Sequence, residues 1–295
     1  MSPRARATLA GTGAVALWSV LALLTVRAGE VPPFQLTSLC LAMGAAVGLA
    51  RARAAGRTLR PALQMQPLVW ALGIGGIFGY HFFYFVALRA APPAEAGLIA
   101  YLWPLLIVLF SGLLPGERLR PAHLAGAAAA FAGAAVILAP NLQGFAPGHA
   151  AGFAAAGACA LIWSGYSVLS RRVGQTPTES VVGFCAAGAV LAGLAHLALE
   201  TPVWPQGAGQ WAAVVALGLG PLGLAFYLWD EGVKRGDIQF LGVAAYAAPL
   251  LSTVALVAAG EAAPRPSLWL AAGLIAGGAA LAALGGRRPR GGRAA

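Results

Sequence analysis

Long apolar stretches, separated by short segments that hold most of the charged residues, run through the whole sequence. About 20 consecutive apolar residues cross the hydrocarbon core of a bilayer as an α-helix. The pattern therefore predicts an all-α membrane protein with ten transmembrane helices around a central cavity. We expect these helices near residues 7–26, 34–50, 67–88, 94–114, 122–139, 150–169, 180–199, 211–229, 238–258 and 267–285.

The apolar pattern occurs twice along the chain. Trp18-Ser19 and Trp163-Ser164 each precede a proline by 86 residues, at Pro104 and Pro249. The flanks match too, since Ala-Tyr-Leu-Trp-Pro-Leu-Leu at 100–106 resembles Ala-Tyr-Ala-Ala-Pro-Leu-Leu at 245–251. We therefore expect two five-helix repeats, residues 1–145 and residues 146–295.

Five helices in each repeat would make the two copies enter the membrane from opposite faces. Inverted repeats of this kind are typical of secondary transporters, whose substrate site lies where the halves meet. If the halves adopt unlike shapes and then exchange them, the site opens to each side of the membrane in turn.

Arginine and lysine set the predicted orientation. If the N-terminus is in the cytoplasm, 16 of these residues lie in cytoplasmic segments, and Arg27, Arg89 and Arg265 lie in segments on the opposite side of the membrane. Positive charge favours the cytoplasmic side, so both termini are expected there, in a multi-pass protein of the cell (inner) membrane. The tail arginines Arg287, Arg288, Arg290 and Arg293 fit a topology signal or a lipid contact, with a specific partner site as the alternative.

The first apolar stretch also has the basic start and apolar middle of a secretory signal peptide. Its Trp18-Ser19 pair recurs in the sixth stretch, and its removal would leave the first repeat one helix short. We therefore expect it to be a transmembrane helix.

The composition of the chain limits the classes of function that it can have. The chain is 59% hydrophobic and 9% charged, with a mean hydropathy of +0.77, which suits a lipid bilayer as its surroundings. A net charge of +10 could indicate a nucleic-acid partner, but the arginines occupy short loops between apolar stretches, so none is expected. The sequence has no CxxC pair, GxSxG, HExxH or P-loop. We predict neither an enzyme nor a cofactor or metal site.

Prolines and glycines mark expected breaks in four of the helices. Pro104 and Pro249 each remove a backbone donor and free a carbonyl four residues earlier. The freed carbonyls of Ala100 and Ala245 could accept from a substrate ammonium, or the prolines could be simple kinks. Clustered glycines weaken a helix, so Gly73, Gly76, Gly79 and Gly220 are expected hinges, with close helix packing as the alternative.

Aromatic side chains deep in the predicted helices form the expected substrate site. Buried Tyr and Trp need hydrogen-bond partners, and a wet cavity supplies them. These residues come from the first, third, fourth, sixth and ninth helices: Trp18, Tyr80, His81, Tyr84, Tyr101, Trp103, Trp163, Tyr166 and Tyr246. Their rings would suit a planar apolar ligand, and an ammonium group over a Trp or Tyr face adds further attraction.

His81 is the ionisable side chain placed well inside a helix beside this group. Ionisable residues within a membrane are functional candidates. A neutral, hydrogen-bonding His81 is the first interpretation, and proton coupling is the second. No Asp or Glu is expected in the middle of the membrane, because Asp230 and Glu231 fall at the inner end of the eighth helix.

Gly116-Glu117 and Gly260-Glu261 each precede a helix of small residues, at corresponding places in the two repeats. With the ten helices, these motifs resemble the EamA-type members of the drug/metabolite transporter superfamily. The run Tyr101-Leu102-Trp103-Pro104-Leu105, with Tyr80-His81 and Tyr84 upstream, resembles the aromatic amino acid exporters of that superfamily. The resemblance implies a ten-helix basket around a central cavity, and Tyr80, His81, Tyr84, Tyr101 and Trp103 as substrate-binding residues.

The predicted function is secondary export of aromatic or other neutral amino acids. A drug or nucleotide-sugar carrier of the same fold is an alternative, although no fixed charge is expected at the centre of the membrane to hold a cation or a phosphate. A membrane scaffold or receptor without a transport cycle is a third possibility.

Overall fold

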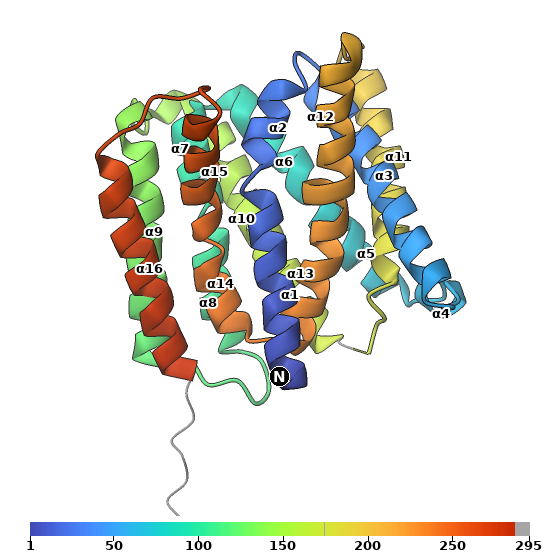
Figure 1. The fold of residues 1–295 in the computed structure, drawn as a ribbon, viewed down its shortest axis with the longest axis horizontal. Coiled ribbons are helices and arrows are strands. Elements are labelled where there is room, and N and C mark those ends of the chain that lie inside the picture. The colour runs from blue at the N-terminus through green and yellow to red at the C-terminus, as the bar shows by residue number, and fades with distance from the viewer. Residues whose placement is uncertain (174, 287–295) are drawn as a thin grey trace, which may run out of the picture.

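The computed structural model describes residues 1–173 and 175–286, and all regular secondary structure within them is helical (Figure 1). The four tail arginines lie outside these residues. The first half contains α1 (Pro3–Trp18), α2 (Leu21–Arg27), α3 (Pro33–Ala54), α4 (Arg60–Leu63), α5 (Pro67–Ile74), η1 (Gly75–Gly79), α6 (Tyr80–Ala90), α7 (Pro93–Ala100), α8 (Trp103–Ser111), α9 (Pro121–Leu138) and η2 (Ala139–Asn141).

The second half follows a similar order, although its first long helix, α10, is unbroken and α4 has no counterpart. It contains η3 (Pro147–His149), α10 (Ala150–Arg172), α11 (Ser180–Leu199), α12 (Gly207–Leu219), η4 (Gly220–Leu224), α13 (Ala225–Arg235), α14 (Ile238–Ala244), α15 (Ala247–Ala258) and α16 (Ser267–Gly286). Within the described residues, ten helical segments are long and apolar enough to cross a membrane, which confirms the predicted number. The eighth, Gly207–Arg235, runs further than predicted, because Asp230 and Lys234 neutralise each other one turn apart.

Breaks interrupt corresponding segments of the two halves. The third segment contains the π-helical turn η1, and the eighth contains the π-helical turn η4 at the equivalent place. These turns include the predicted hinge residues Gly76, Gly79 and Gly220, whereas Gly73 precedes η1. The fourth segment is broken between α7 and α8 and the ninth between α14 and α15, just before Pro104 and Pro249. A further break, between α1 and α2 after Trp18, was not predicted.

Helices of one half pack against helices of the other. Corresponding helices pair in α3 with α11 and in α9 with α16. The contact of α1 with α13 is matched by that of their counterparts α10 and α6. Glu117 lies near both Arg4, at the start of α1, and Arg171, at the end of α10. The first helices of the two halves therefore run in opposite directions, as inverted repeats require.

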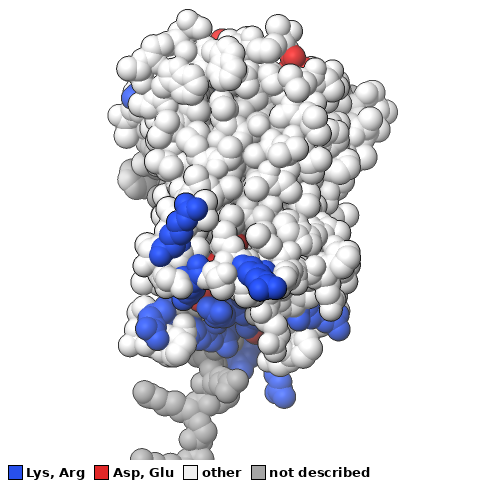
Figure 2. Space-filling model, turned by 90° about the vertical axis from the view of Figure 1, so that its right-hand side faces the viewer, with Lys and Arg blue, Asp and Glu red and all other residues white. Residues whose placement is uncertain are grey.

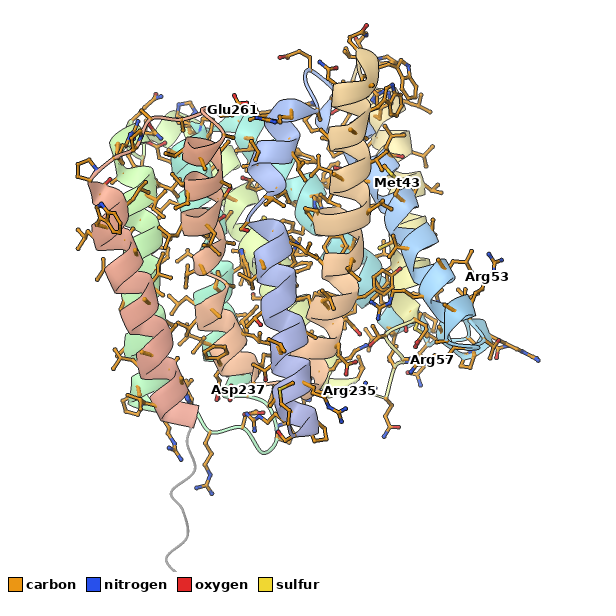
Figure 3. All side chains as sticks on the ribbon, in the orientation of Figure 1. Met43, Arg53, Arg57, Arg235, Asp237 and Glu261 are labelled. Atoms are coloured by element: carbon orange, nitrogen blue, oxygen red, sulfur yellow. The ribbon has the colours of Figure 1, made fainter. Side chains whose placement is uncertain are left out.

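Charged side chains gather at one end of this bundle. Figure 2 shows Lys and Arg concentrated at the end where α1 begins, below a broad surface without charge. Arg53, Arg57, Arg235 and Asp237 lie toward this end, and Glu261 lies at the opposite one (Figure 3). We call the end that holds Arg4, Arg57, Arg171 and Arg235 the arginine-rich end. The charge distribution divides the molecule as the loop arginines predicted.

Small residues bring α9 and α16 into close contact. A Cβ added to Gly126 would lie 2.5 Å from the Gly278 carbonyl oxygen, and one added to Gly278 would lie 2.4 Å from that of Gly126. Gly273 and Gly277 have the spacing of a GxxxG pair but do not make this contact, since a Cβ added to either meets nothing within 4 Å. Gly278, the residue after Gly277 on α16, makes the contact instead.

We expect Gly126→Ala to lower the melting temperature of the purified protein, because its methyl group would push two backbones apart at a cost of about 1–3 kcal/mol. Gly277→Ala is the matched control on the partner helix, where the added methyl group meets open space. Its melting temperature should be unchanged or higher. Equal losses in the two variants would contradict the observed register of α9 against α16.

Candidate functional site

Four tryptophans meet at the centre of the bundle, where α1, α8, α10 and α13 converge. The ring centroids of Trp18 and Trp229 lie 5.1 Å apart, and those of Trp18 and Trp163 lie 5.7 Å apart. Trp103 lies 5.8 Å from Trp229 and 6.3 Å from Trp163. We call Trp18, Trp103, Trp163 and Trp229 the tryptophan cluster. Two members come from each half, so the cluster lies where the halves meet.

Trp229 was missed by the sequence analysis. It occupies the position in α13 that Tyr84 occupies in α6, 145 residues earlier. Comparing the two halves residue by residue would have found it, because an aromatic ring stands at both places. The neighbouring Asp230-Glu231 pair had placed this segment at the membrane boundary, although Trp229 is fully buried.

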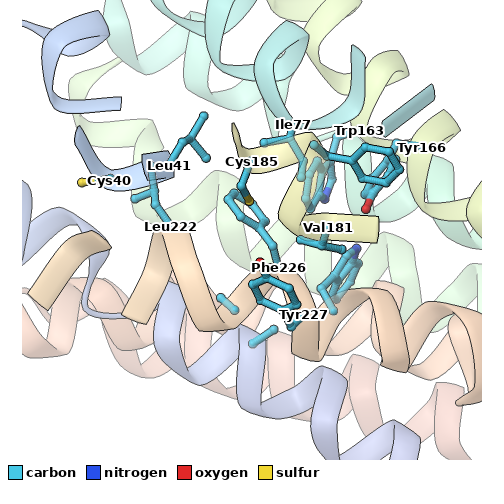
Figure 4. Close-up of a cluster of buried hydrophobic side chains, with 14 of the residues drawn as sticks. Cys40, Leu41, Ile77, Trp163, Tyr166, Val181, Cys185, Leu222, Phe226 and Tyr227 are labelled. Atoms are coloured by element: carbon cyan, nitrogen blue, oxygen red, sulfur yellow. The ribbon is translucent and has the colours of Figure 1, made fainter. Parts of the chain in front are cut away.

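Tyrosines from α6 and α10 extend the aromatic surface to one side. The rings of Tyr80 and Tyr84 are stacked 5.9 Å apart, and Tyr80 lies 5.5 Å from Trp163. Tyr166 lies 5.4 Å from Trp163. Figure 4 shows Trp163 and Tyr166 together, with Phe226 on the facing helix. The structure thus brings together Tyr80, Tyr84, Trp163 and Tyr166, as expected from the aromatic pattern.

The His81 ring lies edge-on to that of Tyr80, with centroids 5.4 Å apart, and does not join the stack of Tyr80 on Tyr84. The His81 ring also lies 6.2 Å from both Phe85 and Phe226. Its Nδ1 lies 2.7 Å from the carbonyl oxygen of Ile77, which only a protonated Nδ1 can satisfy. This contact assigns the neutral ring a proton on Nδ1 and leaves Nε2 as an acceptor. The geometry agrees with a neutral, hydrogen-bonding His81.

Two of the four indole N–H groups are already paired. Trp18 Nε1 donates to the Pro221 carbonyl within the π-helical turn η4 at 3.1 Å, and Trp229 Nε1 donates to Ser167 Oγ at 3.0 Å. In the described part of the chain, the Nε1 atoms of Trp103 and Trp163 have no hydrogen-bond acceptor, and neither is sealed from solvent. These two donors are available to a ligand with an acceptor group.

Tyr101 and Tyr246 occupy corresponding positions in the two halves but differ in burial and in hydrogen bonding. Tyr101 is partly exposed, and its hydroxyl has no hydrogen-bond partner among the described residues. Tyr246 is fully buried, and its ring lies 6.1 Å from Phe131. The Tyr246 hydroxyl donates to the Tyr101 carbonyl at 3.0 Å and accepts from the Leu105 amide at 3.2 Å. The structure therefore places Tyr246 outside the tryptophan cluster, between α14 and α15, with its hydroxyl in the break between α7 and α8.

A buried ion pair lies between the cluster and the arginine-rich end. Lys234 Nζ lies 2.8 Å from Asp230, and both side chains are almost completely buried. Lys234 also donates to the Thr176 carbonyl at 3.0 Å. A cavity of about 10 Å³, room for one water, lies against this pair and Tyr166. The pair is more deeply buried than its place near a helix end had indicated.

The two corresponding glutamates, Glu117 and Glu261, form unlike ion pairs at the two ends of the bundle. Arg171 lies 2.5 Å from Glu117, with side chains 18% and 10% exposed, and also donates to two carbonyls at the end of α13. The corresponding glutamate, Glu261, lies 3.5 Å from Arg27, and the Glu261 and Arg27 side chains are 35% and 53% exposed. Of these two glutamates, the one at the arginine-rich end has the shorter and more buried ion pair.

Arg57 and Glu179 join two loops at the same end, at a distance of 2.5 Å. Burial by itself would raise the pKa of the Glu179 carboxyl, but the hydrogen bond and positive charge of Arg57 outweigh it and hold that pKa below its usual value. This carboxylate therefore stays ionised at neutral pH and keeps its partner.

The fourth and ninth membrane-spanning segments pack against each other at one end of the bundle and not at the other. At the arginine-rich end α8 packs against α14, and a Cβ on Gly242 of α14 would lie 3.1 Å from the Pro104 carbonyl oxygen. At the opposite end their counterparts diverge: α7 packs against α10 and α6, and α15 packs against α1, α2 and α16. The two halves therefore have unlike shapes in this structure.

A duplicated helical bundle whose halves meet at an aromatic centre, with one end closed more tightly than the other, defines a membrane carrier. The chain belongs to the EamA-like transporter family, whose sequence profile matches residues 5–139 and again residues 150–284. It is similar to the aromatic amino acid exporter YddG of Ancylobacter novellus, with 59% identity over 97% of this chain and 99% of that protein.

More distant relatives cover less of the chain. The aromatic amino acid exporter YddG of Salmonella typhimurium is 26% identical over 66% of this chain and 68% of that protein. The uncharacterized transporter YyaM of Bacillus subtilis is 26% identical over 56% of each. A crystal structure at 59% sequence identity matches with a TM-score of 0.91, over 97% of this chain and 100% of that one. These similarities identify a transporter and not an enzyme.

Proposed function

We propose that the protein is a secondary transporter that exports aromatic or other neutral amino acids. The observation that carries the proposal is the tryptophan cluster between the halves, with two indole N–H groups unpaired. Ring contacts add about 0.5–1.5 kcal/mol each, and an ammonium over a Trp face adds about 0.5–2 kcal/mol. The free N–H groups suit a carboxylate. The name of the relative at 59% identity supports the same substrate class.

The substrate-binding residues we propose are those that the structure brings to the cluster or beside it. They are Trp18, Tyr80, Tyr84, Tyr101, Trp103, Trp163 and Tyr166, with His81 Nε2 available as an acceptor and Trp229 added. Pro104 follows the helix break at which Tyr101 and Trp103 lie, and Pro249 follows the corresponding break in the second half. The proposed hinges are the π-helical turns around Gly76, Gly79 and Gly220, together with the adjacent Gly73.

Transport in this proposal proceeds by alternating access between residues 1–145 and 146–295. The unlike packing of spans four and nine supports it, because exchanging the two shapes would separate α8 from α14 and bring α7 to α15. The protein lies in the inner membrane, with both termini and the arginine-rich end in the cytoplasm. The structure then corresponds to a state closed toward the cytoplasm. In this proposal the protein is surrounded by the lipid bilayer and has no nucleic-acid partner.

We expect proteoliposomes that contain the protein to exchange radiolabelled phenylalanine and tryptophan well above protein-free liposomes. Exchange with unlabelled aromatic amino acids inside should be faster than with aspartate or lysine, because no charged side chain lies in the tryptophan cluster. Uptake equal to that of protein-free liposomes would contradict amino acid export. Accumulation of cationic drugs or nucleotide sugars instead would assign the fold to another substrate class, and a protein inactive toward all of them would be a scaffold.

A further inference from the structure

The break between α7 and α8 lacks a backbone hydrogen bond that an unbroken helix would have. In an α-helix the Leu105 amide would donate to the Tyr101 carbonyl, four residues earlier. The Tyr246 hydroxyl lies between these two groups, donating to the carbonyl at 3.0 Å and accepting from the amide at 3.2 Å. One side chain from the second half thus completes a helix of the first half.

The bridge fixes the part of the first half that carries the substrate site. Tyr101 supplies the carbonyl and Trp103 begins α8, between the two bridged residues. Tyr246 is fully buried, and its ring packs against Phe131 of α9, so the hydroxyl has a rigid support. Any shift of α14 relative to α8 would move Tyr101 and Trp103 together.

The second half contains the same elements with the bridge missing. Tyr101 stands at the position that corresponds to Tyr246, and Tyr246 and Leu250 correspond to Tyr101 and Leu105. Across the described residues the Tyr101 hydroxyl makes no hydrogen bond. The bridge is formed where α8 and α14 pack together, and it is absent where α7 and α15 have separated.

We infer that Tyr246 is a positioning residue whose hydroxyl holds the closed contact of α8 with α14, and that Tyr101 makes the equivalent bridge to Tyr246 and Leu250 when α7 closes on α15. Each tyrosine then stabilises one of the two access states. The inference rests on the proposed transport cycle, but it does not depend on which substrate is carried. Tyrosine suits this role because its single hydroxyl oxygen, held on a rigid ring, both donates and accepts.

The test measures access to the arginine-rich end in the absence of substrate. Ser170 of α10 is 3% exposed near that end, so a Ser170→Cys reporter is protected while the end is closed. It is placed in protein with Cys40, Cys159 and Cys185 replaced by alanine, and inside-out vesicles are treated with a membrane-impermeant maleimide. We expect Tyr246→Phe to raise the labelling rate about fivefold to tenfold, as the loss of one or two net hydrogen bonds predicts.

Tyr101→Phe should lower the labelling rate below that of the parent, since it weakens the opposite state. Tyr227→Phe is the matched control, because its hydroxyl also joins the halves through a 2.9 Å bond to the Gly44 carbonyl but lies at no helix break. It should label like the parent.

Two outcomes would overturn the inference. One is parental labelling in Tyr246→Phe, which together with a lower melting temperature is what a purely structural hydroxyl predicts. The other is an equal rise of labelling in Tyr227→Phe. The protein could also fail to exchange amino acids in liposomes while Tyr246→Phe raises the labelling rate and Tyr101→Phe lowers it. That result would contradict the proposed substrate and support the two tyrosine bridges.

Discussion

Transport of phenylalanine should fall about tenfold to a hundredfold in Trp163→Ala. The Trp163 ring lies within 6.3 Å of the rings of Trp18, Trp103 and Trp229, and it also contacts Tyr80 and Tyr166. Its loss removes one wall of the proposed site and one of the two unpaired indole N–H groups. Two or three aromatic contacts with a substrate, at about 0.5–1.5 kcal/mol each, account for a loss of this size.

The measurement is the initial rate of exchange in proteoliposomes, normalised to the amount of reconstituted protein. Trp269→Ala is the control, because this tryptophan is 83% exposed on α16 and belongs to no cluster. It should transport at the parental rate. Trp163→Phe separates folding from binding, since it refills most of the space, and we expect it to recover a large part of the rate. Parental exchange in Trp163→Ala would remove the tryptophan cluster from the substrate site.

Lys234→Met should be the most destabilising of the substitutions considered. It leaves the Asp230 carboxylate buried without its partner, and breaking a buried ion pair in this way costs about 3–5 kcal/mol. Arg235→Met, one residue along the same helix, breaks the exposed pair with Glu231, in which the side chains are 60% and 32% exposed. Exposed pairs at this spacing contribute about 0.3–0.5 kcal/mol, so the control should be nearly neutral.

Melting temperatures of the detergent-purified variants test this difference. The double variant Asp230→Leu, Lys234→Met should regain much of the stability lost in Lys234→Met, because well-packed apolar residues often replace a buried pair without loss. If Lys234→Met and Arg235→Met melt together, the Asp230–Lys234 pair is not buried as described.

Much of this architecture follows from the sequence because the bilayer permits so few solutions. An apolar stretch of the right length must be a helix. The two copies of Trp-Ser and of Tyr-x-x-Pro located the repeat and three members of the aromatic site, Trp18, Tyr101 and Trp163. The glycine clusters indicated bends at the places where the π-helical turns occur. These features can be predicted from the sequence because each depends on a few neighbouring residues.

Other features depend on contacts that no local pattern encodes. The role of Tyr246 arises from two backbone groups 141 and 145 residues away in sequence. Gly278, and not Gly277, meets α9 because of a rotation of α16 that its almost uniformly small and apolar sequence leaves open. The burial of Asp230 depends on Lys234, on the Thr176 carbonyl and on the packing of α10 and α13.

Half of the chain's eight tryptophans stand in the tryptophan cluster. Indole rings at such separations exchange excitation energy efficiently, so light absorbed by any of them is shared among all four. A molecule that binds against these rings alters the emission of the whole group at once. The unlabelled protein therefore carries its own optical reporter, and titrations followed by intrinsic fluorescence can rank its ligands without a radioisotope or an attached dye.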